Sequence, residues 1–173
     1  MFEYLDHWEK ILVTGPQRSG TRICTKMIAE DTGYWPIHEE EFGVDSLNRL
    51  WHKLETSRNV VIQAPAMMVY ANLLGMHDPG LGVVVMRRDV QEIRASEVRI
   101  GWRWEKPELI RCFTLTGNAA EIRYQNWDQF QKQDLGAQAI EVKYEDLEAH
   151  PLWVPKEQRA HFGPRQTRLG RRK

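Results

Sequence analysis

A glycine-bounded turn near the N-terminus carries residue types that bind phosphate groups. The stretch ILVTGPQRSGTR runs from an apolar segment through Gly15 to Gly20, with Arg18, Ser19 and Thr21 around the second glycine. If a buried strand ends at the first glycine and a helix follows the second, backbone N–H groups point into the turn. The helix N-terminus then adds partial positive charge, and both effects favour a bound anion. The sequence therefore predicts a phosphate-binding turn between a strand and a helix.

This turn departs from the Walker A sequence in its second half. Gly15 and Gly20 have the Walker A spacing, but that sequence continues with Lys and then Ser or Thr. Thr21 and Arg22 stand at those two positions, and the basic residue Arg18 precedes the second glycine instead. Because the lysine is missing, we expect the turn to bind a phosphate ester that needs less charge neutralisation than a triphosphate does.

The elements around the turn predict an α/β protein. Four short apolar segments, 11–14, 59–63, 82–86 and 139–142, are typical of strands buried on both faces. Helical patterns separate them: Gly20 to Gly33, a helix capped by Asp45 or Ser46, 67–76, Asp89 to 100, and most of 107–133. This alternation predicts a three-layer α/β/α fold with a short, mainly parallel sheet. Ligands of such folds bind at the carboxyl ends of the strands.

The composition fits one globular domain with an unevenly distributed charge. The 173 residues are 42% hydrophobic and 28% charged, and no apolar run approaches the ~20 residues that span a bilayer. With two cysteines and no secretory leader pattern, the sequence predicts a cytoplasmic protein without a membrane partner. Residues 151–173 hold seven Lys or Arg and one acidic residue in a chain of zero net charge. We expect a nucleotide-binding domain over 1–150 and a basic, irregular tail over 151–173 that closes over its ligand.

The turn and two later motifs resemble the sulfotransferases that use 3′-phosphoadenosine 5′-phosphosulfate (PAPS). Arg18-Ser19-Gly20-Thr21 is similar to the family's 5′-phosphosulfate loop, and Arg88 with Ser96 has the spacing of its 3′-phosphate site. The stretch YEDLEAHP, which begins at Tyr144, is similar to the segment that bears the family's adenine-binding tyrosine. The resemblance spans 11–151 in the family's motif order. It implies transfer of a sulfonate group from PAPS to a hydroxyl or amine by in-line displacement, without a metal.

The resemblance also implies which residues bind the donor. The expected ligands are Gly15, Gln17, Arg18, Ser19, Gly20, Thr21, Arg22, Arg88, Ser96 and Tyr144, joined by Arg165, Gln166, Thr167 and Arg168 of the tail. Arg87 is the alternative to Arg88 if the strand ends one residue earlier. Arg18 is also a catalytic candidate, because a guanidinium at the turn would stabilise charge on the leaving oxygens.

The acidic stretch PIHEEEFGVD offers a catalytic base. It resembles the Glu-x-x-Phe segment of the carbohydrate-type sulfotransferases, and if Phe42 is that aromatic residue, Glu39 is the base. Glu41, Glu40 and His38 are the alternatives. The acceptor would be a small molecule or a carbohydrate, whose hydroxyl or amine loses a proton to this base.

Two other functions stay open. A P-loop phosphotransferase acting on a nucleoside or small metabolite would need an equivalent of the missing lysine. A non-catalytic nucleotide or nucleic-acid binder would use the basic tail and the aromatic, basic stretch GWRWEKP, although nucleic acid is the less favoured partner. No cluster of His, Cys and Asp has the spacing of metal ligands, and the oligomeric state stays open.

Overall fold

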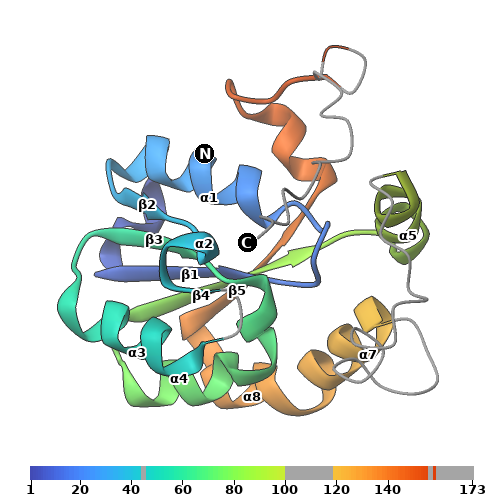
Figure 1. The fold of residues 1–173 in the computed structure, drawn as a ribbon. Coiled ribbons are helices and arrows are strands. Elements are labelled where there is room, and N and C mark those ends of the chain that lie inside the picture. The colour runs from blue at the N-terminus through green and yellow to red at the C-terminus, as the bar shows by residue number, and fades with distance from the viewer. Residues whose placement is uncertain (44–45, 100–118, 156–157, 159–173) are drawn as a thin grey trace, which may run out of the picture.

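A five-stranded sheet forms the middle layer of the molecule (Figure 1). The computed structural model describes residues 1–43, 46–99, 119–155 and 158. The strands are β1 (Lys10–Thr14), β2 (Trp35–Ile37), β3 (Val60–Gln63), β4 (Leu81–Arg87) and β5 (Ala139–Lys143). Their order is β2-β3-β1-β4-β5, and every neighbouring pair is parallel. All five carboxyl ends therefore meet at one edge of the sheet, with β1 in the centre.

Helices cover both faces of this sheet, which confirms the predicted three-layer architecture. The α-helices are α1 (Thr21–Thr32), α2 (Glu39–Phe42), α3 (Leu47–Thr56), α4 (Ala71–His77), α5 (Val90–Arg99), α7 (Ala119–Asn126) and α8 (Lys132–Leu135). Short 3-10 helices span Glu3–His7, Pro65–Tyr70, Gly136–Gln138 and Glu145–Ala149, and a π-helical turn spans Trp127–Gln131. Figure 1 shows α1 on one face of the sheet and α3, α4 and α8 on the other. Within the described residues, no helix is both long and apolar enough to cross a membrane.

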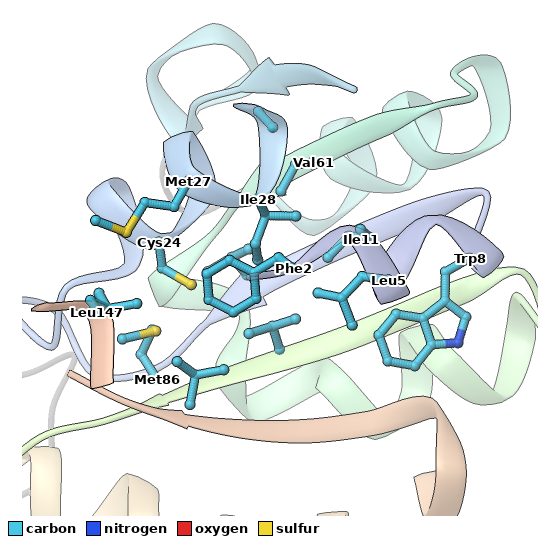
Figure 2. Packing of buried hydrophobic residues seen from close by; sticks show 14 residues of the cluster. Phe2, Leu5, Trp8, Ile11, Cys24, Met27, Ile28, Val61, Met86 and Leu147 are labelled. Carbon is cyan, nitrogen blue, oxygen red and sulfur yellow. The ribbon is translucent and has the colours of Figure 1, made fainter. Parts of the chain in front are cut away.

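The central strand β1 is buried on both faces, and its alternating side chains enter two different cores. Ile11 packs with Met27 and Ile28 of α1 and with Phe2 near the N-terminus (Figure 2). Val13 belongs to the same core. On the opposite face, Leu12 packs with a second group that includes Leu50, Leu54, Ile62 and Leu74. This alternation with period two is what a strand between two helical layers requires. The two cores hold β1 in place, and the turn that follows it is therefore anchored at a rigid strand end.

Capping residues are found at most of the helix ends that the sequence predicts. Ser46 caps α3 by accepting a hydrogen bond from the Arg49 N–H at 3.4 Å. Gly33 ends α1 with a φ of 73°, and its N–H donates to the Ala29 oxygen. The Asp89 carboxylate accepts from the N–H groups of Gln91 and Glu92 at the start of α5.

Two elements differ from the predictions. The sequence predicts four strands, and the fifth, β2, is a three-residue edge strand that contains Pro36. An edge position tolerates a proline, because the missing N–H faces away from the neighbouring strand. The helix expected over 67–76 is instead a 3-10 helix, Pro65–Tyr70, followed by α4. The segment expected to be helical over 107–133 is helical from 119 to 133, and residues 107–118 lie outside the described residues.

Candidate functional site

The turn between β1 and α1 has the conformation of an anion-binding loop. It lies at the carboxyl edge of the sheet, between the ends of β3 and β4. Gly15, Arg18 and Gly20 have φ angles of 140°, 69° and 103°, and the Ser19 hydroxyl closes the turn by donating to the Pro16 oxygen at 2.6 Å. Gly20 is the N-cap of α1, so no side chain caps this helix. The first N–H groups of α1 are consequently available to an anion in the turn.

Both glycines of the turn are required by close packing. A Cβ at Gly15 would lie 2.9 Å from the Met86 oxygen, and a Cβ at Gly20 would lie 2.5 Å from Cδ2 of Tyr144. Tyr144, at the end of β5, thus covers the second glycine of the turn. The structure brings Tyr144 to the phosphate turn, and its predicted contact with an adenine ring stays a prediction.

Arg88 braces the turn from the end of β4. Its Nη1 donates to the main-chain oxygen of Arg18 at 2.9 Å, and its Cζ lies 4.1 Å from the centre of the Tyr144 ring. Its Nη2 also reaches a carboxylate oxygen of Glu92 at 3.3 Å. Tyr124 fixes the strand end itself, because its hydroxyl accepts from the Arg88 N–H and donates to the Met86 oxygen, each at 3.0 Å. Arg88 therefore holds the only non-glycine left-handed residue of the turn, Arg18, in place.

A serine on α5 accepts hydrogen bonds from two guanidinium groups beside the phosphate turn. Ser96 is 2% exposed, and its hydroxyl accepts from Arg18 Nε at 3.1 Å and from Arg99 Nη2 at 3.3 Å. Burial lowers the pKa of Arg18, and the charges of Arg99 and Arg88 lower it further. Three mutually repelling cations beside a phosphate turn would be stabilised by a bound polyanion. The structure thus joins Ser96 directly to Arg18, and joins Arg88 to the backbone of the same residue.

Arg87, the alternative to Arg88 as a phosphate ligand, contacts other residues. Its guanidinium forms ion pairs with Asp128 and with Glu141, the latter at 3.1 Å, and its Cζ lies 4.8 Å from the Tyr124 ring centre. These pairs join β4 to β5 and to the π-helical turn. Of the two arginines that end β4, only Arg88 contacts the phosphate turn.

Among the acidic residues after β2, Glu39 has the environment of a catalytic base. Burial raises its pKa from the ordinary 4.5 to about 7, and the charge of Glu40 adds to the rise, while Arg22 and Arg123 oppose it. Its Oε2 is buried and has no hydrogen-bond partner among the described residues. A half-buried carboxyl with a pKa close to neutrality is suited to take and release a proton.

The neighbouring candidates have structural partners instead. Glu41 Oε1 accepts from the His38 N–H at 2.9 Å and so fixes the start of α2. The carboxylate of Glu40 pairs with Arg22 at 3.1 Å, on the surface. Arg22 was predicted to bind the donor nucleotide. Its ion pair with Glu40 connects its side chain to α2 instead. Gln17 lies half-buried within the turn. Arg165, Gln166, Thr167 and Arg168 lie outside the described residues.

Gln63, which connects two parts of the site, is a residue that the sequence analysis missed. It ends β3, is 5% exposed, and lies opposite Val13 in the sheet. Its side chain contacts the His38 ring at 3.1 Å and the Thr21 hydroxyl at 3.4 Å. The sequence did hold one signal for Gln63: it is a polar residue at the carboxyl end of a strand predicted to lie in the same sheet as the phosphate turn.

Comparisons with known proteins return solved structures only. No protein-family model and no curated protein sequence matches the chain. A shikimate kinase from Acinetobacter baumannii, in complex with shikimate, matches with a TM-score of 0.52 and 10% identity over 82% of this chain and 88% of that chain. A shikimate kinase from Bacteroides thetaiotaomicron matches with a TM-score of 0.46, 18% identity, and coverage of 78% and 85%. A gluconokinase from Sinorhizobium meliloti gives 0.45, 16%, and coverage of 79% and 83%. The chain shares its fold with the shikimate kinase from Acinetobacter baumannii.

These findings overturn the sulfotransferase function predicted from the sequence. The structure that matches with a TM-score above 0.5 is a shikimate kinase and not a sulfotransferase. The prediction was wrong because its motifs are short and report a requirement common to many folds of this kind: a turn that binds phosphate after the first strand. Such a turn carries no information on whether phosphorus or sulfur is transferred.

Proposed function

We propose that this chain is a P-loop phosphotransferase that moves the terminal phosphoryl group of a nucleoside triphosphate to a hydroxyl of a small molecule. One observation carries the proposal: an arginine-braced phosphate turn and the half-buried Glu39 carboxyl, whose pKa is about 7, follow strands whose carboxyl ends meet at one sheet edge. A shikimate kinase of the same fold supports an acceptor of that size. PAPS, the donor that the sulfotransferase resemblance implies, is represented in the binding comparison below by its product, adenosine 3′,5′-bisphosphate.

The reaction divides between the turn and the acidic helix α2. The acceptor oxygen forms a bond to the terminal phosphorus while the bond from that phosphorus to the bridging oxygen breaks. The nucleoside diphosphate leaves with the electron pair, and the acceptor proton passes to the Glu39 carboxylate. Since charge spreads over the transferring and leaving oxygens, catalysis depends on positioning and on positive charge.

Arg18 supplies the charge that a Walker A lysine would otherwise supply. Its guanidinium lies at the turn, held by Ser96 at 3.1 Å, and its backbone is held by Arg88. A guanidinium binds phosphate oxygens in a two-pronged geometry and stays charged at every physiological pH. Arg18 and Arg88 therefore take the place of the lysine that a P-loop phosphotransferase would need.

The residues at the turn do not fit the usual magnesium site of this fold. Arg22 stands where the Walker A hydroxyl ligand belongs, and the neighbouring strand β3 ends in Gln63 rather than in a carboxylate. Within the described residues, no group of three or more His, Cys, Asp and Glu could hold a metal ion. In the proposed chemistry the protein's own positive charge at the turn comes from arginines.

A binding comparison tests the proposal. Isothermal titration calorimetry would measure ATP, with and without Mg²⁺, inorganic pyrophosphate and adenosine 3′,5′-bisphosphate against the full chain. We expect ATP and pyrophosphate to bind, and Arg18→Ala to abolish both signals. Tight binding of adenosine 3′,5′-bisphosphate without binding of ATP or pyrophosphate would contradict a triphosphate donor.

A further inference from the structure

A hydrogen-bonded chain of three side chains connects the phosphate turn to the helix that bears the base. It runs from Thr21, the first residue of α1, through Gln63 at the end of β3, to His38, the N-cap of α2. We propose that Gln63 is a positioning residue that fixes the tautomer of His38 and couples occupancy of the phosphate turn to the placement of Glu39. The contact itself stands on geometry, whereas its effect on turnover rests on the proposed function.

The amide of Gln63 determines which way each hydrogen bond runs. An amide has one oxygen that only accepts and one NH₂ group that only donates. Nε2 lies 3.4 Å from Thr21 Oγ1, so it donates to that hydroxyl, and Oε1 lies 3.1 Å from His38 Nδ1. With the amide in this orientation Oε1 can only accept, so Nδ1 of the histidine carries the proton. The neutral His38 ring is therefore the Nδ1–H tautomer, with the lone pair on Nε2.

The same geometry leaves the Thr21 proton available to the turn. Thr21 is 4% exposed and follows Gly20, the last residue of the turn. Its oxygen accepts from Gln63, which leaves its own O–H as a donor that an anion in the turn can use. A phosphate oxygen that accepts this proton polarises the hydroxyl, and each later bond of the chain strengthens in turn. Binding at the turn is thereby transmitted to the His38 ring.

The chain ends beside the proposed base. His38 precedes Glu39 directly, and its N–H is held by Glu41 Oε1 at 2.9 Å. The His38 ring thus joins α2 to β3, and Gln63 is the residue through which β3 holds that ring. Because β3 also pairs with β1 through Val13 and Gln63, the turn and α2 are held by the same two central strands. Loss of the amide would release the start of α2 while leaving the turn folded.

Nitrogen-15 spectroscopy of the histidine rings tests the tautomer in the ligand-free protein. We expect His38, assigned by the signal lost in His38→Asn, to be the Nδ1–H tautomer. Gln63→Leu should remove this preference. Gln63→Glu should retain it, because a carboxylate also accepts from Nδ1–H. An Nε2–H tautomer in the native protein, or an unchanged tautomer in Gln63→Leu, would overturn the assignment.

The coupling is tested by adding ATP, or inorganic pyrophosphate, to the same samples. The His38 ring signals should shift in the native protein but not in Thr21→Val or Gln63→Leu. Turnover of Gln63→Leu should fall by about twofold to tenfold, as expected for one lost hydrogen bond, with the ATP dissociation constant nearly unchanged. If ATP binds and the His38 signals do not move, the coupling is wrong and the proposed function stands. If neither probe binds the native protein, the proposed function and the coupling both fail, while the ligand-free spectra still decide the tautomer.

Discussion

The Arg88 side chain donates to the main-chain oxygen of Arg18 at 2.9 Å, across 70 positions of the chain. The second arginine of the site thus holds the first in a left-handed conformation, in which a residue other than glycine is strained. The affinity of the turn for phosphate should depend on this contact as much as on the Arg18 guanidinium.

Replacing Arg88 should weaken nucleotide binding without unfolding the protein. Arg88→Ala removes a charged donor to the turn, which corresponds to about 1.5–3 kcal/mol of ATP binding free energy. Arg87→Ala is the matched control, because it removes the neighbouring guanidinium, whose ion pairs lie with Asp128 and Glu141. Calorimetry should show weaker ATP binding only for the first variant, and a lower melting temperature mainly for the second. Equal ATP affinities in both variants would refute the bracing role.

The second glycine of the turn should resist substitution more strongly than Gly33, which is also left-handed. In Gly20→Ala the new methyl group would meet Tyr144 at 2.5 Å, in addition to the strain of a φ of 103°. Gly33→Ala is the matched control, since its φ is 73° and no atom of the described residues lies within 4 Å of its Cβ. The control should lose about 1–2 kcal/mol of unfolding free energy from backbone strain alone. Urea unfolding should show a larger loss for Gly20→Ala, and equal losses would argue against close packing of Tyr144 on the turn.

The pH dependence of turnover should identify Glu39 as the base. With a pKa of about 7, its carboxyl becomes an acceptor as the pH rises, so turnover should increase through about pH 7 and then level off. Glu39→Gln should lower turnover by about 10²–10⁴-fold, the usual contribution of a positioned base. Glu41→Gln, which keeps an acceptor for the His38 N–H, should keep the native profile. A native profile in Glu39→Gln would assign the base to another residue.

The same carboxyl should make the protein less stable as the pH rises. Its pKa is raised from 4.5 to about 7 in the folded state, so between these values the folded state binds more protons than the unfolded state. The stability that Glu39 contributes is complete below about pH 4.5 and is lost as the pH rises to about 7. Urea unfolding from pH 4 to 8 should show this decline, and Glu39→Gln should flatten it. A native-like decline in that variant would mean that other groups cause it.

Local chemistry explains how much of the fold the sequence could predict. The segments 11–14 and 82–86 are apolar throughout because both faces of their strands are covered, and Ser46 and Gly33 mark helix ends through their own backbone chemistry. Strand β2 escaped prediction because three residues with a proline form a strand only when Val60–Ile62 lies beside them.

The site was predictable where one segment supplies the chemistry. The turn from Gly15 to Gly20 shows its predicted phosphate-binding character in its own sequence. The resemblance of the acidic stretch to a Glu-x-x-Phe segment pointed to Glu39, whose role as the base stays a prediction. The contact of Gln63 with His38 joins residues 25 positions apart and depends on the order of the strands, which no local pattern encodes. The motifs also could not separate phosphoryl from sulfonate transfer, because both need the same anion-binding turn.

Transfer of the terminal phosphate of labelled ATP is the measurement that tests the central claim most directly. The native chain would be incubated with ATP labelled at the terminal phosphorus and a panel of small hydroxyl compounds that includes shikimate. We predict that label moves to at least one acceptor in the native protein and that Arg18→Ala loses this transfer by more than 10²-fold, since electrostatic groups at the transferring oxygens contribute at least that much. Contradiction would come from label that stays on ATP with every acceptor, or from transfer that Arg18→Ala leaves intact.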